Sequence, residues 1–175
     1  DSSKQFNPNI EISDIKDITI RKGAYSLLMC RHYLKDPIST DVDACWFEIG
    51  ALIQMTNDLY DTYKDSKEGI STFANRLDSI NEIAKFYKMQ KQHFISKINC
   101  LPMNSFAKLQ FCIQTAVISA FGDIALAQLK KRKITFPIKD NLDIMNRKDL
   151  IIDMEKPLNV LRLLYYTYKN GKLWT

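Results

Sequence analysis

The sequence predicts an all-α protein, and three observations support this fold class. Apolar side chains recur every three or four residues over long stretches, whereas strand-like alternation is nearly absent. Only five glycines and five prolines occur, which argues against a loop-dominated chain. The content of 46% apolar and 26% charged residues is typical of a globular protein. A length of 175 residues then suits one helical domain, residues 1–175, a bundle of five or six helices.

The first half of the chain contains two predicted helices. Residues 1–12 are polar and turn-prone. A helix is expected over residues 13–34, ending before Pro37, because the residue before a proline avoids helical geometry. A second helix is expected from residue 40 or 41 to about residue 65, since its apolar positions step by three and four. Residues 66–73 are expected to form a loop.

The middle of the chain predicts a third and a fourth helix. Ser79 and Glu82 have the spacing of a capping box, so a helix is expected from there to about residue 98. Residues 105–131 predict a long helix that is apolar on most faces, and therefore central. Gly122, next to Asp123, is expected to mark a kink in it.

The C-terminal part predicts one short and one longer helix. Phe136-Pro137 ends the long helix region, and a short helical piece is expected over residues 140–150. The last helix is expected over residues 157–168, because Pro157 suits a first turn and Asn170-Gly171 suits a helix end.

Composition and charge exclude several functional classes. The net charge of +5 is too mild for a nucleic-acid-binding protein, and the basic run at 129–133 suits the C-terminal end of a helix. No stretch reaches about 18 uninterrupted apolar residues, so no membrane span is expected. No signal peptide is visible, and a cytoplasmic location is expected. The sequence begins at Asp1 without a methionine, which leaves room for an upstream segment.

Cysteine and histidine do not predict a metal site. The four cysteines have no CxxC spacing and lie in apolar stretches, so they are expected to be reduced core residues. His32 and His93 are too few and too far apart to build a site on imidazole.

The segment QMTNDLYDTYKD, residues 54–65, concentrates oxygen-bearing side chains on one side of a helix. Asn57, Asp61 and Asp65 follow at intervals of four, Asp58 lies beside Asp61, and Gln54 lies one turn earlier. A solvated acidic face is the ordinary interpretation. However, like charges near the C-terminal end of a helix are unfavourable. Mg²⁺ prefers such oxygen ligands and often shares them with substrate phosphates, so the segment is a candidate metal site.

Arg21 and Lys22 belong to the preceding helix. Two antiparallel helices with a short connector would place them near Asp58 and Asp65, where they could neutralise a diphosphate. An ordinary ion pair between the helices explains the same arrangement equally well.

At this point the motifs resemble a known superfamily. IQMTNDLYD is similar to the second aspartate-rich motif of trans-prenyl diphosphate synthases, F-Q-[IL]-x-D-D-x-[LF]-D. Gln54, Asp58 and Asp61 are in register with it, and Asn57 replaces the first acid. The same stretch resembles the metal triad N-D-x-x-[ST]-x-x-x-E of class I terpene synthases. That resemblance implies Asn57, Asp61 and Asp65 as ligands.

Two flanking segments extend the resemblance over residues 18–76. RKGAYSLL is similar to the K-T-x-x-L-F helix of prenyl synthases, with Lys22 at the lysine and Gly23 where threonine is usual. KDSKEGISTFAN resembles the basic, glycine-containing loop after the motif, where Lys64 or Lys67 would approach the diphosphate.

The resemblance implies a helical bundle of the isoprenoid synthase type and a Mg²⁺-dependent carbon–oxygen lyase. Such an enzyme ionises an allylic prenyl diphosphate, and the carbocation then cyclises or couples. Chain elongation by a trans-prenyl diphosphate synthase is the alternative. The implied cofactor is a cluster of three Mg²⁺ ions with the substrate diphosphate. The implied metal ligands are Asn57, Asp58, Asp61 and Asp65, and the implied diphosphate-binding residues are Arg21, Lys22, Gln54, Lys64 and Lys67.

The first aspartate-rich motif of this superfamily, D-D-x-x-D, is missing from the sequence. Asp36, Asp41 and Asp43 lie at a helix start, where capping and dipole effects explain them. The chain is therefore expected to be the C-terminal half of a synthase that needs its N-terminal half, or a partner chain, for catalysis. A non-catalytic partner subunit or a decayed synthase is the other alternative, and a homodimer is a further expectation.

The last helix and several aromatic residues add weaker resemblances. Arg162, Tyr165 and Tyr166 are similar to an Arg-Tyr pair that closes over the diphosphate in terpene synthases, although an ordinary packed helix explains them too. Four aromatic residues could shelter a carbocation in a shared cavity, with core packing as the alternative: Tyr25, Trp46, Phe111 and Phe121.

Overall fold

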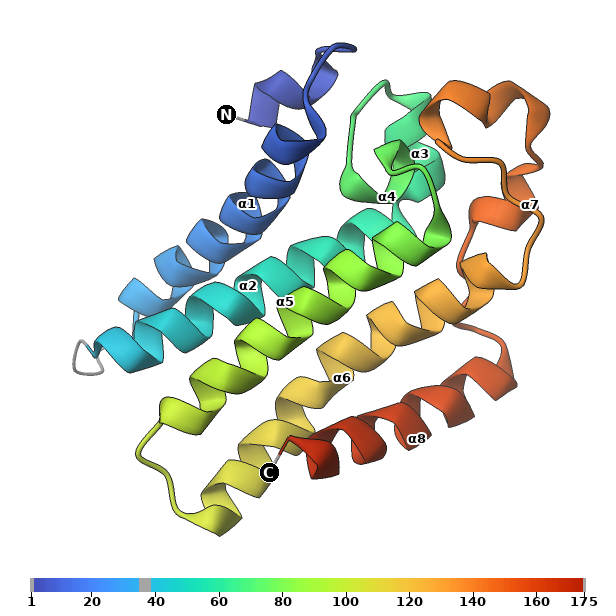
Figure 1. Cartoon of the computed structure of the whole chain (residues 1–175). Helices are drawn as coiled ribbons and strands as arrows, with labels where there is room; N and C mark the ends of the chain where they lie inside the picture. Colours follow the sequence, from blue (N-terminus) through green and yellow to red (C-terminus); the bar gives the residue numbers. More distant parts are fainter. Residues whose placement is uncertain (1, 35–38, 175) are drawn as a thin grey trace.

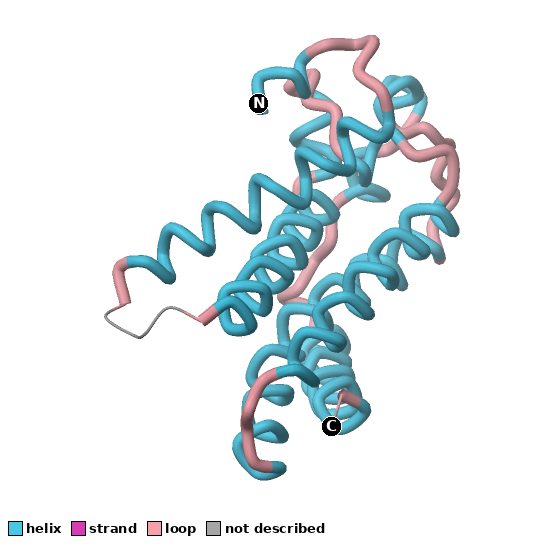
Figure 2. Tube along the Cα trace, turned by 60° about the vertical axis from the view of Figure 1, so that its left-hand side comes forward, coloured by secondary structure: helices cyan, strands magenta, loops and turns pink. Residues whose placement is uncertain are grey.

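The computed structural model describes residues 2–34 and 39–174, and over these ranges it contains helices and no strand (Figures 1 and 2). The predicted all-α class is therefore confirmed. Five helices of 17 to 26 residues make up most of the fold: α1 (Ile12–His32), α2 (Thr40–Tyr60), α5 (Ile80–Cys100), α6 (Ser105–Lys130) and α8 (Pro157–Leu173).

The long helices lie beside one another in chain order, from α1 at one side of the molecule to α8 at the other (Figure 1). The core helices α2, α5 and α6 all contact one another, while α1 packs mainly on α2 and α8 packs on α6. The expectation that the long fourth helix is central is thus confirmed. In length and composition α6 could also cross a membrane, but a core helix passes the same test.

The short elements gather near one end of the bundle, where η1, α3, α4 and α7 lie (Figure 1). The helices α3 and α4 contact each other, and α3 also contacts η2 and α7. Their bounds are η1 (Ser2–Phe6), α3 (Thr62–Lys67), α4 (Phe73–Arg76), η2 (Lys139–Ile144) and α7 (Arg147–Leu150).

Several predicted helix ends are confirmed. The Ser79 hydroxyl accepts a hydrogen bond from the Glu82 N–H at 3.2 Å, as a helix cap requires. Pro157 is in the first turn of α8, and Asp41 and Asp43 are in the first turn of α2. Asp36 and Pro37, also discussed above, lie outside the described residues.

The second helix is shorter than predicted. It ends at Tyr60, and α3 starts at Thr62, so the beginning of the expected loop is helical. The Thr62 hydroxyl donates to the carbonyl oxygens of Asp58 and Leu59 at 3.0 and 2.9 Å, which competes with regular helix bonding. The Asp61 N–H still donates to Asn57 O at 2.8 Å, so the side chains keep their helical succession.

The prediction that Asn170-Gly171 ends the last helix is wrong, because α8 continues to Leu173. Both residues are buried and serve packing instead. The Asn170 amide donates to Ser119 Oγ at 3.1 Å. A Cβ atom on Gly171 would lie 2.8 Å from Ile113 Cα, so glycine permits α8 to approach α6.

The helix α6 runs without interruption through Gly122, the residue expected to mark a kink. Gly122 makes room for the ring of Tyr87, whose hydroxyl would lie 2.1 Å from a Cβ atom there. One further expectation needs correction. Cys45 and Cys112 are buried as expected, but two other cysteines are exposed rather than in the core: Cys30 and Cys100.

Candidate functional site

The candidate site depends on a close contact between the antiparallel helices α1 and α2. A Cβ atom on Gly23 would lie 2.1 Å from the Gly50 carbonyl oxygen, and one on Gly50 would lie 2.4 Å from the Gly23 oxygen. Only glycine fits such a contact between backbones. It brings Thr19 of α1 alongside the last turns of α2, within hydrogen-bonding distance of Asp58.

Asp58 is the buried centre of this region, with 4% of its surface exposed. Its carboxylate accepts hydrogen bonds from the Thr19 hydroxyl at 3.1 Å and from the Gln54 amide at 2.7 Å. Burial raises the pKa of Asp58 to about 6, because loss of hydration opposes the charged form more than these hydrogen bonds and the Lys22 charge favour it.

Asp65, on α3, is electrostatically linked to the same group. Its pKa is raised to about 7, first by burial and then by the negative charges of Asp58 and Asp61, while Lys22 and Lys64 lower it. These mutual effects require that the carboxylates and Lys22 lie close together, as the antiparallel arrangement predicts. Asp61 itself is exposed between its two neighbours.

The four predicted metal ligands differ in their surroundings. Asn57 and Asp61 are exposed, Asp65 is half-buried, and Asp58 is directed toward α1. Asn57 also lines a groove of about 200 Å³ beside Gly23. Within the described residues, no three acidic, histidine or cysteine side chains are grouped so that they could hold a metal. The donor set therefore fits only part of a Mg²⁺ site, of the kind in which one or two carboxylates act together with phosphate oxygens.

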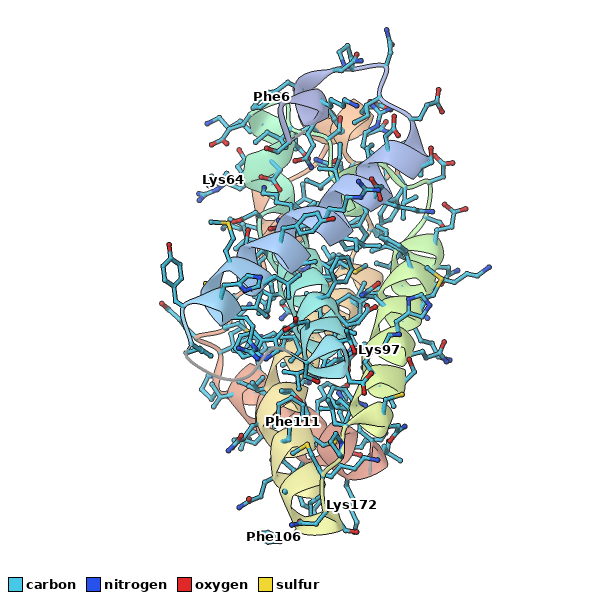
Figure 3. The ribbon with its side chains drawn as sticks, turned by 90° about the vertical axis from the view of Figure 1, so that its left-hand side faces the viewer. Phe6, Lys64, Lys97, Phe106, Phe111 and Lys172 are labelled. Carbon is cyan, nitrogen blue, oxygen red and sulfur yellow. The ribbon has the colours of Figure 1, made fainter. Side chains whose placement is uncertain are left out.

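The basic residues lie around the carboxylates. Lys22 and Arg21 line a groove of about 350 Å³ with Asp17, and Arg21 pairs with Asp17 at 2.9 Å in an exposed ion pair. Lys64 and Lys67 are exposed on α3. In Figure 3, Lys64 lies near one end of the molecule, far from Phe106 and Lys172 at the other.

The structure does not bring the C-terminal candidates to this site. Arg162, Tyr165 and Tyr166 are on α8, which lies across the bundle from α1 (Figure 1). The Arg162 guanidinium donates to Asn159 Oδ1 at 3.2 Å, a bond within the same helix.

The aromatic residues expected to share a cavity are spread over three helices. Tyr25 on α1 is exposed and meets Phe47 edge-on, with ring centroids 6.0 Å apart. Phe121 on α6 packs against Tyr60, with centroids 6.2 Å apart. The other two, Trp46 on α2 and Phe111 on α6, are half-buried.

Reasoning from the sequence missed Thr19 and Gly50. Thr19 donates to the central carboxylate, and Gly50 completes the helix contact. The available signal was a glycine near the middle of each of two consecutive helices, where glycine is otherwise unfavourable.

Comparisons with models of protein families, with curated proteins and with solved structures find no match to this chain. The geometry of the α1–α2 site is therefore the basis for the functional proposal that follows.

Proposed function

We propose that this chain supplies half of the Mg²⁺ and diphosphate site of a class I isoprenoid synthase. One observation carries the proposal: Asp58 is buried with a raised pKa beside Asp61, Asp65 and Lys22, at the end of a tight helix pair. No lysine or arginine of the described residues forms an ion pair with Asp58. A buried carboxylate without a cation is unfavourable, and such groups are common where a ligand supplies the missing charge.

Each residue of the site has a role in this proposal. Asn57, Asp61 and Asp65 offer oxygen atoms to Mg²⁺ from the open side, whereas Gln54 and Thr19 hold the Asp58 carboxylate in place. Lys22, Lys64 and Lys67 meet the phosphate oxygens, and Arg21 borders the adjoining groove. Three oxygen ligands and three lysines are less than a full site, so the first aspartate-rich motif would come from an N-terminal half or a partner chain.

The reaction would break the bond between the diphosphate oxygen and the first carbon of an allylic prenyl chain. The electron pair stays on the departing diphosphate, whose charge Mg²⁺ would offset when bound. The lysines of α1 and α3 stabilise the same developing charge. The allylic cation left behind then cyclises or couples with a second isoprene unit, and the new carbocation loses a proton to give an alkene.

Two other functions use the same site. The hydrogen bond from Gln54 to Asp58 also suits a trans-prenyl diphosphate synthase, which elongates a chain. A non-catalytic partner subunit is favoured by the absence, within the described residues, of any complete three-ligand metal group.

The binding step can be tested on the chain itself. Calorimetric titration with inorganic diphosphate should show binding that requires Mg²⁺. Asp61→Ala or Lys22→Ala should weaken this binding about tenfold, because each substitution removes one charged contact. Asp143→Ala, an exposed carboxylate on η2, is the matched control and should bind normally. The proposal would be refuted if diphosphate bound with the same affinity without Mg²⁺ and in both substituted variants.

A second measurement separates the synthase from a non-catalytic partner. When the chain is combined with a segment carrying the first aspartate-rich motif, farnesyl diphosphate should release diphosphate in the presence of Mg²⁺. Binding without release would favour the partner subunit.

A further inference from the structure

Two cationic side chains come together where α4 contacts η2, at the end of the bundle that holds the short elements (Figure 1). Arg76 is the last residue of α4, and Lys139 is the first residue of η2. Lys139 Nζ donates to Ser71 Oγ at 2.7 Å, just before the start of α4. Arg76 Nη1 in turn lies 3.7 Å from Asp140 Oδ1, next to Lys139. Arg76 and Lys139 are here named the α4–η2 cation pair.

The guanidinium of Arg76 is incompletely paired. Its Nε atom is buried and has no hydrogen-bond partner within the described residues. Its ion pair with Asp140 is long, and the Asp140 side chain is 57% exposed, so this pair contributes little. A buried N–H group without an acceptor is unfavourable, and an oxygen atom of a ligand would remove that cost.

The ammonium of Lys139 also lacks an anion. It donates to the Gly69 carbonyl oxygen and to Ser71 Oγ, both at 2.7 Å and both neutral, which leaves one of its three hydrogens. It forms no ion pair with a carboxylate of the described residues. Burial and then the Arg76 charge lower the pKa of Lys139, and Asp140 opposes this only in part. The two cations therefore lie close enough to repel each other.

The charges and hydrogens of this pair indicate the chemistry of its ligand. Two cations face one carboxylate, and that carboxylate is largely exposed. A phosphate group carries nearly two negative charges at pH 7 and several acceptor oxygens. The planar guanidinium of arginine suits two phosphate oxygens at once, and a lysine ammonium adds a point charge. Inorganic phosphate and phosphate monoesters share this chemistry.

We propose that the α4–η2 cation pair binds a phosphate group, which accepts hydrogen bonds from Arg76 and Lys139 and displaces Asp140 from Arg76. The proposal is independent of the diphosphate site, because it needs no Mg²⁺ and uses none of the residues assigned there. Two partly exposed charged contacts make a weak site, so a Kd on the order of 1 mM is expected.

Calorimetric titration of the 175-residue chain with inorganic phosphate tests the site, without Mg²⁺ and at constant ionic strength. The wild type should bind saturably. Arg76→Gln and Lys139→Gln should each weaken binding about tenfold, because each removes one charged contact. Lys88→Gln removes an exposed lysine of α5 and, as the matched control, should bind normally. Circular dichroism checks that the variants fold.

Asp140 provides a test that leaves both cations in place. Because Asp140 competes with the ligand for Arg76, Asp140→Asn should tighten phosphate binding about threefold. A purely structural role of the Arg76–Asp140 pair predicts no such gain. The pKa of Lys139, followed by NMR of its side chain, should also rise when phosphate binds, because a nearby anion favours the charged ammonium.

Two further ligands define the chemical class. Acetate carries a single charge and should bind at least about tenfold more weakly than phosphate. Phenyl phosphate distinguishes the sources of the phosphate group. Tighter binding than inorganic phosphate identifies a monoester as the ligand, and weaker binding identifies free phosphate. Either result supports the proposal.

Four results would overturn the proposal. These are no saturable phosphate binding, equal binding in Arg76→Gln and Lys139→Gln, acetate binding as tight as that of phosphate, and no change in Asp140→Asn. Loss of phosphate binding in Lys22→Ala but not in Arg76→Gln would assign the anion to the α1–α2 site instead. Arg76→Gln should leave the Mg²⁺-dependent binding of diphosphate intact, so failure of one proposal is distinguishable from failure of the other.

Discussion

Two aspartates within helices, Asp58 and Asp123, differ in the partners that the fold provides for their carboxylates. Asp123 on α6 receives Lys91 of α5 at 2.7 Å and the Asn170 amide of α8 at 2.9 Å, so it ties three helices together. Asp58 on α2 receives two neutral donors, and its pKa is raised to about 6. The first carboxylate has its partners within the fold, whereas the second has an incomplete environment that a ligand could complete.

The close contact that creates the Asp58 environment should be the most sensitive point. Gly23→Ala places a methyl group 2.1 Å from the Gly50 carbonyl oxygen, so α1 must move away from α2. We expect the free energy of unfolding to fall by about 3 kcal/mol, as for other overpacked positions. Urea denaturation measures this, and Gly69→Ala is unsuitable as a control because Gly69 has a φ of 77°. Ser26→Ala, exposed on the same helix, should change little.

Loss of the Asp123 carboxylate, which pairs with Lys91, should have the next largest effect on the free energy of unfolding. Asp123→Ala leaves the Lys91 ammonium, whose side chain is 15% exposed, without its partner. Breaking a largely buried pair should lower the free energy of unfolding by about 2 to 3 kcal/mol. Urea denaturation with Asp143→Ala as the exposed control measures the difference, and a change below about 0.5 kcal/mol would show that the pair is unimportant.

Substitution of Asp58, whose carboxylate has no ion-pair partner among the described residues, should instead raise the free energy of unfolding. The pKa of Asp58 is higher in the folded chain, about 6, than in the unfolded chain, about 4. Protonation of Asp58 therefore stabilises the fold fully below about pH 4, and this stabilisation is lost as the pH rises through about 6. Asp58→Asn removes this loss and keeps hydrogen-bonding capacity for Thr19 and Gln54. The variant should therefore be more stable than the wild type by about 1 to 2 kcal/mol at pH 7.5.

The pH dependence supplies the control for that comparison. The difference between Asp58→Asn and the wild type should shrink toward pH 4, where the wild-type carboxyl is protonated. An equal difference at both pH values would mean that ionisation of Asp58 is not its cause.

The smallest effect should come from the single hydroxyl that faces Asp58. Thr19→Val preserves the shape of the side chain and removes its 3.1 Å hydrogen bond to the carboxylate. The free energy of unfolding at pH 7.5 should fall by about 1 kcal/mol, and the pKa of Asp58 should rise further. In an Asp58→Asn background the same substitution should matter less, and a double-mutant cycle would measure that coupling.

The long helices could be predicted because their apolar periodicity is local. The break after Tyr60 could not, because residues 54–65 contain no glycine or proline that would mark a helix end. Gly171 suggested a helix end, but its role depends on Ile113 of another helix. Such roles are set by tertiary packing, which a local pattern does not contain.

The candidate site, like the fold, could be predicted only where it depends on local sequence patterns. Helical spacing gathered Asn57, Asp61 and Asp65, and antiparallel pairing placed Lys22 near them. The burial of Asp58 was not predictable, because it depends on how closely α1 approaches at Gly50. The resemblance to isoprenoid synthases stays a prediction that rests on the sequence motifs of residues 18–76.

The titration of the Asp58 carboxyl carbon, followed by NMR, tests the central claim most directly. The free chain should titrate with a midpoint at about 6. With Mg²⁺ and inorganic diphosphate, the midpoint should fall by about one pH unit or more, because a nearby cation favours the ionised carboxylate. A midpoint that Mg²⁺ and diphosphate leave unchanged would contradict the proposal that this carboxylate belongs to a metal–diphosphate site.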